Sequence, residues 1–185
     1  MKTCYYEIGG HSIAVRFVNE ENNDDLIPSF APFRLQDEPA ELLFTMLVDD
    51  NLDWPQQNDE IGQFDCGGCN HGVYRTDDGG YLYSIHDIHD VLCSRMQSNA
   101  DFSQCSVSLY GKTWVQRNYG LNNALMMAYA FASACSATML MHASVIRQGA
   151  KGYLMTAPSG TGKSTHTRLW YDNIPGCDLM NDDNP

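Results

Sequence analysis

Basic residues are scarce in this sequence. Its 185 residues include 11 lysines and arginines against 23 aspartates and glutamates, which gives a formal net charge of −12. A surface of that sign repels polyanions, so neither nucleic acid nor an anionic membrane is expected as a partner. A negatively charged nucleotide would need a local site, formed by backbone N–H groups, a helix N-terminus, a lysine or a metal ion.

The sequence also lacks an apolar leader behind a basic start, because the first residues run directly into strand-like alternation. Its 7 cysteines are an odd number at irregular spacings, which is typical of reduced thiols and predicts a cytoplasmic protein. Residues 121–146 carry no charged side chain and are rich in alanine, serine and asparagine. That composition favours a buried helix followed by a buried strand over a membrane span, so no membrane partner is expected.

A second Cys-x-x-Cys pair is missing as well. Cys66 and Cys69 enclose Gly67-Gly68 and have the spacing of a zinc knuckle, but a structural zinc needs four ligands. A hairpin turn at the two glycines explains the spacing without metal. The zinc alternative stays open because further ligands exist along the chain, at His86, His89, Cys93 and Cys105.

Residues 1–115 are predicted to form a β-rich region. Alternating apolar residues and glycine-containing turns predict strands at 3–8, 12–18, 61–66, 70–76, 81–85 and 104–110. Residues 40–48 fit either a strand or a helix, and residues 87–97 are predicted as a short helix.

Residues 116–185 are predicted to begin an α/β unit, so the chain as a whole is α+β. A helix is expected from residue 121, followed by strands at 140–146 and 153–157, a helix at 163–171 and a strand at 178–181. The residues expected to face the core from the first helix recur at helical spacing: Leu121, Leu125, Ala128, Ala132, Cys135 and Met139.

A glycine-rich motif lies between the second of these strands and the following helix. Residues 157–164 read Ala-Pro-Ser-Gly-Thr-Gly-Lys-Ser and match the Walker A pattern except for alanine at the first position. Glycines allow successive N–H groups to surround phosphate oxygens, a lysine supplies a cation, and a serine hydroxyl can ligate magnesium. We therefore expect a site for ATP formed by Ser159, Gly160, Thr161, Gly162, Lys163, Ser164 and Thr165. The alternative, a strand-to-helix turn without a ligand, leaves a lysine at a helix start with no anion to neutralise it.

Two carboxylates, Asp182 and Asp183, follow the last predicted strand, 18 residues after Ser164. Adjacent carboxylates at a strand end point in different directions. One can ligate Mg²⁺ while the other acts on water or a hydroxyl, so both are predicted as catalytic and metal-binding residues. Lys163 is predicted as a further catalytic residue. Which aspartate takes which role is open, and an acidic turn before Pro185 is the alternative.

Three segments in this order resemble the core of HPr kinase/phosphorylase and are similar to ATP-dependent phosphoenolpyruvate carboxykinase. They are Met-His-Ala-Ser-Val at 141–145, Ser-Gly-Thr-Gly-Lys-Ser-Thr at 159–165 and Asn-Asp-Asp at 181–183. The resemblance covers about 121–185, roughly the last third, and the first 110 residues resemble no family. It implies a P-loop domain with a mixed central sheet that continues well beyond residue 185, so the chain is expected to be a truncated part of a larger domain that turns over ATP poorly by itself.

The resemblance also implies roles for single residues. His142 matches a histidine that contacts the catalytic metal in the carboxykinase pattern, and a second divalent metal is compatible with that pattern. From the residues alone, a single histidine in an apolar run is more often a hydrogen-bonded core residue. Lys163 and Ser164 match the phosphate and metal residues, and one member of the pair Asp182 and Asp183 matches the base toward the substrate hydroxyl.

Two functions follow as hypotheses. The first is a phosphotransferase that uses Mg-ATP and a serine or small-molecule hydroxyl as acceptor. The second is a nucleotide-binding sensor or scaffold without turnover. A protein or small-molecule acceptor is an expected partner of the first, and association into a homo-oligomer is left open.

Overall fold

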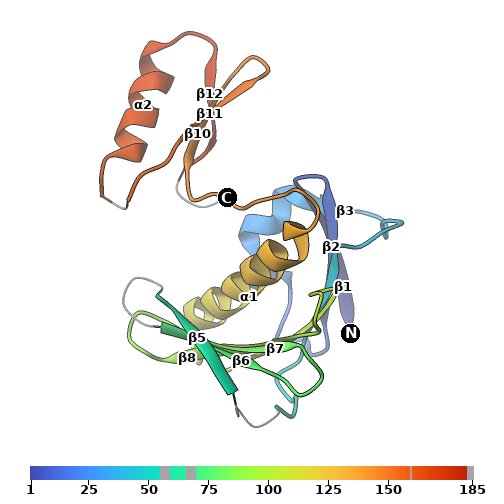
Figure 1. The fold of residues 1–185 in the computed structure, drawn as a ribbon. Coiled ribbons are helices and arrows are strands. Elements are labelled where there is room, and N and C mark those ends of the chain that lie inside the picture. The colour runs from blue at the N-terminus through green and yellow to red at the C-terminus, as the bar shows by residue number, and fades with distance from the viewer. Residues whose placement is uncertain (55–58, 66–69, 159, 183–185) are drawn as a thin grey trace. The chain divides into compact units, whose positions relative to one another are not determined.

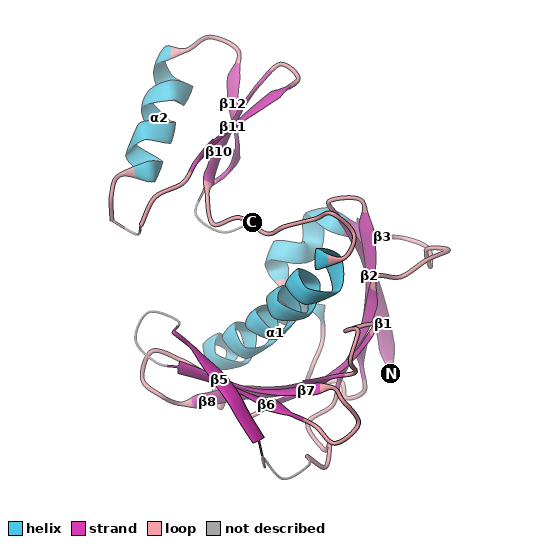
Figure 2. Cartoon of the chain, viewed as in Figure 1, coloured by secondary structure: helices cyan, strands magenta, loops and turns pink. Residues whose placement is uncertain are grey.

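The computed structural model describes residues 1–54, 59–65, 70–158 and 160–182. The chain forms two compact units. The first unit is Met1–Thr138 and the second is Met139–Pro185. Figure 1 shows each unit as a sheet with one long helix, and Figure 2 separates helices from strands by colour. We describe each unit by itself.

The first unit is built on one large sheet. Its strands are β1 (Lys2–Ile8), β2 (His11–Phe17), β3 (Arg34–Leu35), β4 (Phe44–Val48), β5 (Asp59–Asp65), β6 (Asn70–Arg75), β7 (Tyr81–His86), β8 (Leu92–Ser98) and β9 (Gln104–Leu109). They lie in the order β3-β1-β2-β4-β9-β8-β7-β6-β5. β4 pairs in parallel with β2 and β9, whereas the other neighbours are antiparallel, so the sheet is mixed.

Most of the predicted strands in this unit are confirmed. The Gly9-Gly10 turn joins β1 to β2, with both glycines at positive φ, 57° and 82°. The ambiguous segment 40–48 contains β4, which is short and buried between two parallel neighbours. Two short 3₁₀ helices, Asp24–Leu26 and Pro28–Phe33, precede β3.

The predicted helix at 87–97 is wrong. Asp87 accepts hydrogen bonds from the backbone N–H groups of His89 and Val91 and forms a turn, after which β8 begins at Leu92. β8 pairs with β7 on one side and β9 on the other. The hydrogen bonds of two ladders outweigh a local helical pattern of apolar residues.

The helix expected from residue 121 begins earlier. It is α1 (Trp114–Ala134), and it starts at a capping box in which Thr113 Oγ1 accepts from the Gln116 N–H while the Gln116 side chain accepts from the Thr113 N–H. Residues of one face are buried against β8, β9, β4 and β7, including Leu121, Leu125 and Ala128.

The end of α1 differs from the expected core face. Cys135 caps the helix and is exposed, and Met139 lies beyond it and is 75% exposed. The sequence placed a boundary near residue 115, whereas the units divide between Thr138 and Met139. The reason is that the apolar face of α1 packs on the sheet of the first unit.

The second unit contains β10 (Ser144–Gln148), β11 (Lys151–Met155), α2 (Lys163–Asn173) and β12 (Cys177–Asn181). The strand order is β11-β10-β12, and α2 packs against β10 and β12. The predicted helix at 163–171 and strand at 178–181 are confirmed, and the strand predicted at 140–146 begins later, at Ser144. An ion pair between Arg147 of β10 and Asp178 of β12 joins the two strands across the sheet, with Nε and Oδ1 3.0 Å apart.

The described residues establish a mixed α+β fold that is rich in β-strands. In the described part of the second unit, β10 pairs antiparallel with both β11 and β12. The mixed sheet belongs to the first unit. Among the helices that the structure describes, none combines the length and apolar character needed to cross a membrane.

Candidate functional site

The topology of the second unit brings the three sequence motifs to one edge of its sheet. β10 runs antiparallel to both β11 and β12, so β11 and β12 run in the same direction on either side of it. The end of β11 therefore lies beside the start of β10, where Ser144 pairs with Met155. The end of β12 lies at the same edge, where Val145 pairs with Asn181. The glycine-rich loop, the segment around His142 and the carboxylate of Asp182 all extend from this edge.

The glycine-rich loop adopts a conformation that requires glycine at two positions. Gly160 has φ 78° and Gly162 has φ 96°, both in the left-handed region. No heavy atom lies within 4 Å of where a Cβ would stand at either position, so the requirement comes from the backbone dihedrals. Gly162 is the N-cap of α2, and its carbonyl accepts the His166 N–H at 2.9 Å. Ser159 lies outside the described residues.

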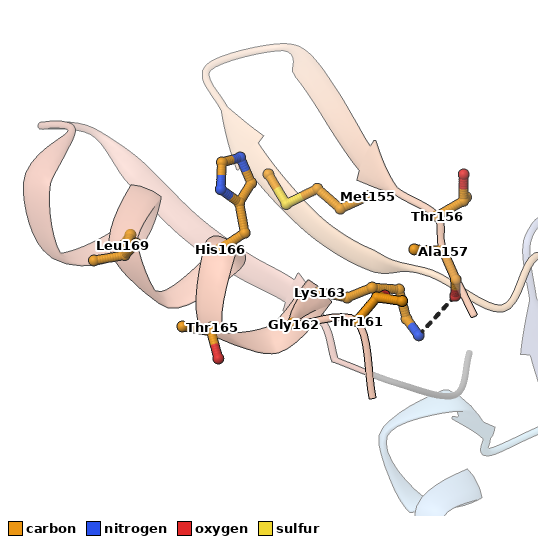
Figure 3. A pocket seen from close by; sticks show the side chains of 9 residues that line it. All are labelled: Met155, Thr156, Ala157, Thr161, Gly162, Lys163, Thr165, His166 and Leu169. Carbon is orange, nitrogen blue, oxygen red and sulfur yellow. Dashed lines mark hydrogen bonds between the residues drawn. The ribbon is translucent and has the colours of Figure 1, made fainter. Parts of the chain in front are cut away.

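Lys163 is the first residue of α2 and is 9% exposed. Its Nζ donates to the carbonyl oxygen of Ala157 at 3.0 Å, across the loop, as Figure 3 shows. No carboxylate of the described residues forms an ion pair with this ammonium. A buried cation at the positive end of a helix, hydrogen-bonded to a neutral carbonyl, is an electrostatic environment that favours an anion.

Asp182, directly after β12, is hydrogen-bonded to the first residue of β10. Its Oδ1 accepts the Ser144 hydroxyl at 2.6 Å. This hydrogen bond, the nearby Ser164 hydroxyl and the charge of Lys163 hold the pKa of Asp182 below its usual value. Asp182 is thus an ionised carboxylate beside two hydroxyl groups, and carboxylate and hydroxyl oxygens are ligands suited to a hard cation such as Mg²⁺.

Two hollows adjoin the first half of α2. One has a volume of about 530 Å³, is shown in Figure 3 and is lined by Met155, Thr156, Ala157, Thr161, Gly162, Lys163, Thr165, His166 and Leu169. The other has a volume of about 650 Å³ and is lined by Ser164, Thr165, Thr167, Arg168, Tyr171, Asp178, Leu179 and Asp182. Thr165 lines both hollows, and the consecutive residues Lys163 and Ser164 line one each. A ligand that contacts both side chains would lie across the N-terminus of α2.

The remaining predicted site residues are placed less directly. His142 is exposed and lies two residues before β10, at the same edge, and its role toward a metal stays a prediction. Asp183 lies outside the described residues. Cys66 and Cys69 also lie outside them, and the part of the chain that the structure describes contains no cluster of three metal-ligating side chains.

Two partners in the site were not predicted from the sequence. Ser144 belongs to the Met-His-Ala-Ser-Val segment, but its hydrogen bond to Asp182 spans 38 residues and has no signal in residue spacing. The Ala157 carbonyl that holds Lys163 belongs to the one position that departs from the Walker A pattern. A backbone oxygen is available whatever the side chain, so this contact does not depend on a glycine at position 157.

Comparison of the chain with protein-family models, with curated proteins and with solved structures found no match. A function is therefore inferred from the residues and the geometry of this edge.

Proposed function

We propose that the second unit binds ATP with magnesium at the shared edge of β10, β11 and β12, as in the P-loop fold of the HPr kinase-like family. The triphosphate would lie against the N–H groups of the glycine-rich loop and the start of α2, next to Lys163. Ser164 and Asp182 would hold the cation. A bound magnesium ion supplies charge neutralisation for the phosphate oxygens of the nucleotide.

The observation that carries this proposal is the meeting of Ser164 and Asp182. These residues come from two motifs, one after β11 and one after β12, and their side chains line the same hollow beside α2. A loop without a ligand has no need of a carboxylate beside its serine. The residues present also fit the cation, because both side chains offer oxygen atoms and Asp182 is ionised.

We further propose that the bound ATP serves phosphoryl transfer to a hydroxyl acceptor, a serine or a small molecule. In this reaction, Lys163 would orient the transferring phosphate and offset its charge, and Asp183 would take the proton of the acceptor hydroxyl.

One observation favours a nucleotide-binding module without turnover as the second candidate. Asp182 accepts a hydrogen bond from the Ser144 hydroxyl, and its pKa lies below the usual value, so this carboxylate is a weak base. If Asp183 does not serve as the base, the site binds nucleotide without transferring phosphate.

Substitution of Lys163 by alanine tests the nucleotide site. The change removes a charge-assisted contact worth about 1.5–3 kcal/mol, so the affinity for Mg-ATP in calorimetry should fall roughly 10- to 150-fold. Lys151→Ala, at an exposed position at the start of β11, is the matched control and should bind like the parent. Equal affinities of Lys163→Ala and the parent would exclude the proposed site.

A transfer assay separates the two candidates. The parent is incubated with γ-labelled ATP, magnesium and either serine-containing peptides or small alcohols. Label on the acceptor supports the phosphotransferase. Binding that depends on Lys163, with no label transferred to any acceptor, supports the module without turnover.

A further inference from the structure

Ser144 lies at the start of β10 and is completely buried, with 0% of its surface exposed. β10 is the middle strand, paired with β11 and β12 on its two sides, so the backbone of Ser144 is held by the sheet. Its hydroxyl points to Asp182, an exposed residue directly after β12. The pair joins a fixed buried donor to a carboxylate at the end of a strand.

The hydrogen bond has a directional consequence for Asp182. A carboxylate has two oxygens, and rotation about its side chain bonds exchanges the directions in which they point. With Oδ1 held 2.6 Å from the Ser144 hydroxyl, this rotation is restricted. A metal ligand that is already oriented loses less conformational freedom when it binds the cation.

We propose that Ser144 is a positioning residue, which orients the carboxylate of Asp182 and thereby sets the magnesium affinity of the nucleotide site. This inference rests on the proposed function, because it requires that Mg-ATP binds at this edge. Ser144 itself contacts neither the nucleotide nor the cation. It acts through Asp182, and a hydroxyl at position 144 is the group that matters.

The test compares Ser144→Thr with Ser144→Val, two side chains of nearly the same shape that differ in the hydroxyl. ATP affinity is measured as a function of Mg²⁺ concentration, and again in EDTA. We expect Ser144→Val to need about 10- to 100-fold more Mg²⁺, the range found when partners that orient metal ligands are removed. Ser144→Thr should stay close to the parent, and binding in EDTA should be the same for both variants.

A double substitution shows whether Ser144 acts through Asp182. In the Asp182→Asn background, Ser144→Val should cause little further loss of Mg²⁺ affinity, because the carboxylate that Ser144 orients is gone.

Ser108→Val is the matched control. Ser108 is also a buried serine in a strand, but its hydroxyl donates to the backbone carbonyl of Asp49. Should Ser144→Val fail to fold, Ser144→Ala makes the same comparison.

The possible results separate the two proposals. If the parent does not bind Mg-ATP, the proposed function fails and the inference fails with it. If the parent binds and the valine and threonine variants titrate alike with Mg²⁺, the nucleotide site stands and the role of Ser144 is refuted. Equal losses in EDTA and in Mg²⁺ would also refute it, because they would show a general effect on the unit.

Discussion

The conformation of Gly162 gives the most direct test of the glycine-rich loop. Its φ of 96° lies in the left-handed region, where an L-residue pays about 1–2 kcal/mol. A Cβ at this position meets no heavy atom within 4 Å, so Gly162→Ala adds this conformational cost without a clash. If the loop escapes the strain by moving, the hydrogen bond from the His166 N–H to the Gly162 carbonyl, worth about 1 kcal/mol, is lost instead.

When the free loop moves in this way, binding must restore the left-handed conformation, so Mg-ATP binding weakens by the roughly 1–2 kcal/mol of restored strain, which corresponds to about a 5- to 30-fold loss of affinity. Isothermal calorimetry measures the affinity, and hydrogen exchange at the His166 amide reports on the loop.

Two other glycines of the unit serve as controls. Gly149 lies in the turn between β10 and β11 and has φ 59°. Gly149→Ala introduces the same conformational strain away from the site, so it should lower the stability of the protein and leave its affinity for Mg-ATP unchanged. Gly152→Ala adds a Cβ in open space without positive φ and should change neither. Unchanged affinity in Gly162→Ala would refute the reasoning.

Two further predictions concern the first unit. Burial raises the pKa of the Cys105 thiol to about 12, so at pH 8 only about one molecule in ten thousand carries its thiolate. Peptide mapping after brief alkylation of the native protein should find exposed Cys135 modified and Cys105 intact, and faster modification of Cys105 would contradict the burial argument. Burial lowers the pKa of His71 in the folded protein below its usual 6.5. Between these two pKa values the unfolded chain binds more protons than the folded protein. The free energy of unfolding should therefore decrease as the pH falls through 6.5 toward the pKa of the folded protein. His71→Gln should flatten this part of the pH profile in urea denaturation, and a parallel profile would count against it.

The sequence was informative wherever structure depends on nearby residues. The hairpin at Gly9-Gly10, the start of α2 after Gly162 and the strand before Asp182 all follow from short-range turn, cap and periodicity signals. The capping box of Thr113 and Gln116 was equally readable and would have placed the start of α1 correctly.

β8 shows why some elements could not be predicted. Two of its inward positions are serines, Ser94 and Ser98, which are buried although they are polar. They hide the alternation of a strand, while Ile88, Leu92 and Met96 recur at a helical interval. Ser94 is accommodated because its hydroxyl donates to the Gly120 carbonyl of α1 at 3.0 Å, a contact across 26 residues. Such long-range partners determine that this segment forms a strand, and the spacing of its residues does not reveal them.

The same limit applies to the candidate site. The loop residues and Asp182 were identified from their order along the chain, whereas their meeting depends on β11 and β12 running in one direction beside β10. The hydrogen bond from Ser144 to Asp182 follows from that arrangement. Sequence could name the chemical groups, and topology had to supply their proximity.

The antiparallel course of β10 has a practical consequence for labelling this protein. The turn at Gly149-Ala150 and the segment Pro175-Gly176 that leads into β12 both lie at the edge of the sheet opposite the loop. Ala150 is exposed and has no positive φ, whereas Gly149 beside it has φ 59° and is best left unchanged. A fluorophore or an affinity tag attached at Ala150 would stand a full strand length away from Asp182, so the label would not enter the proposed nucleotide site.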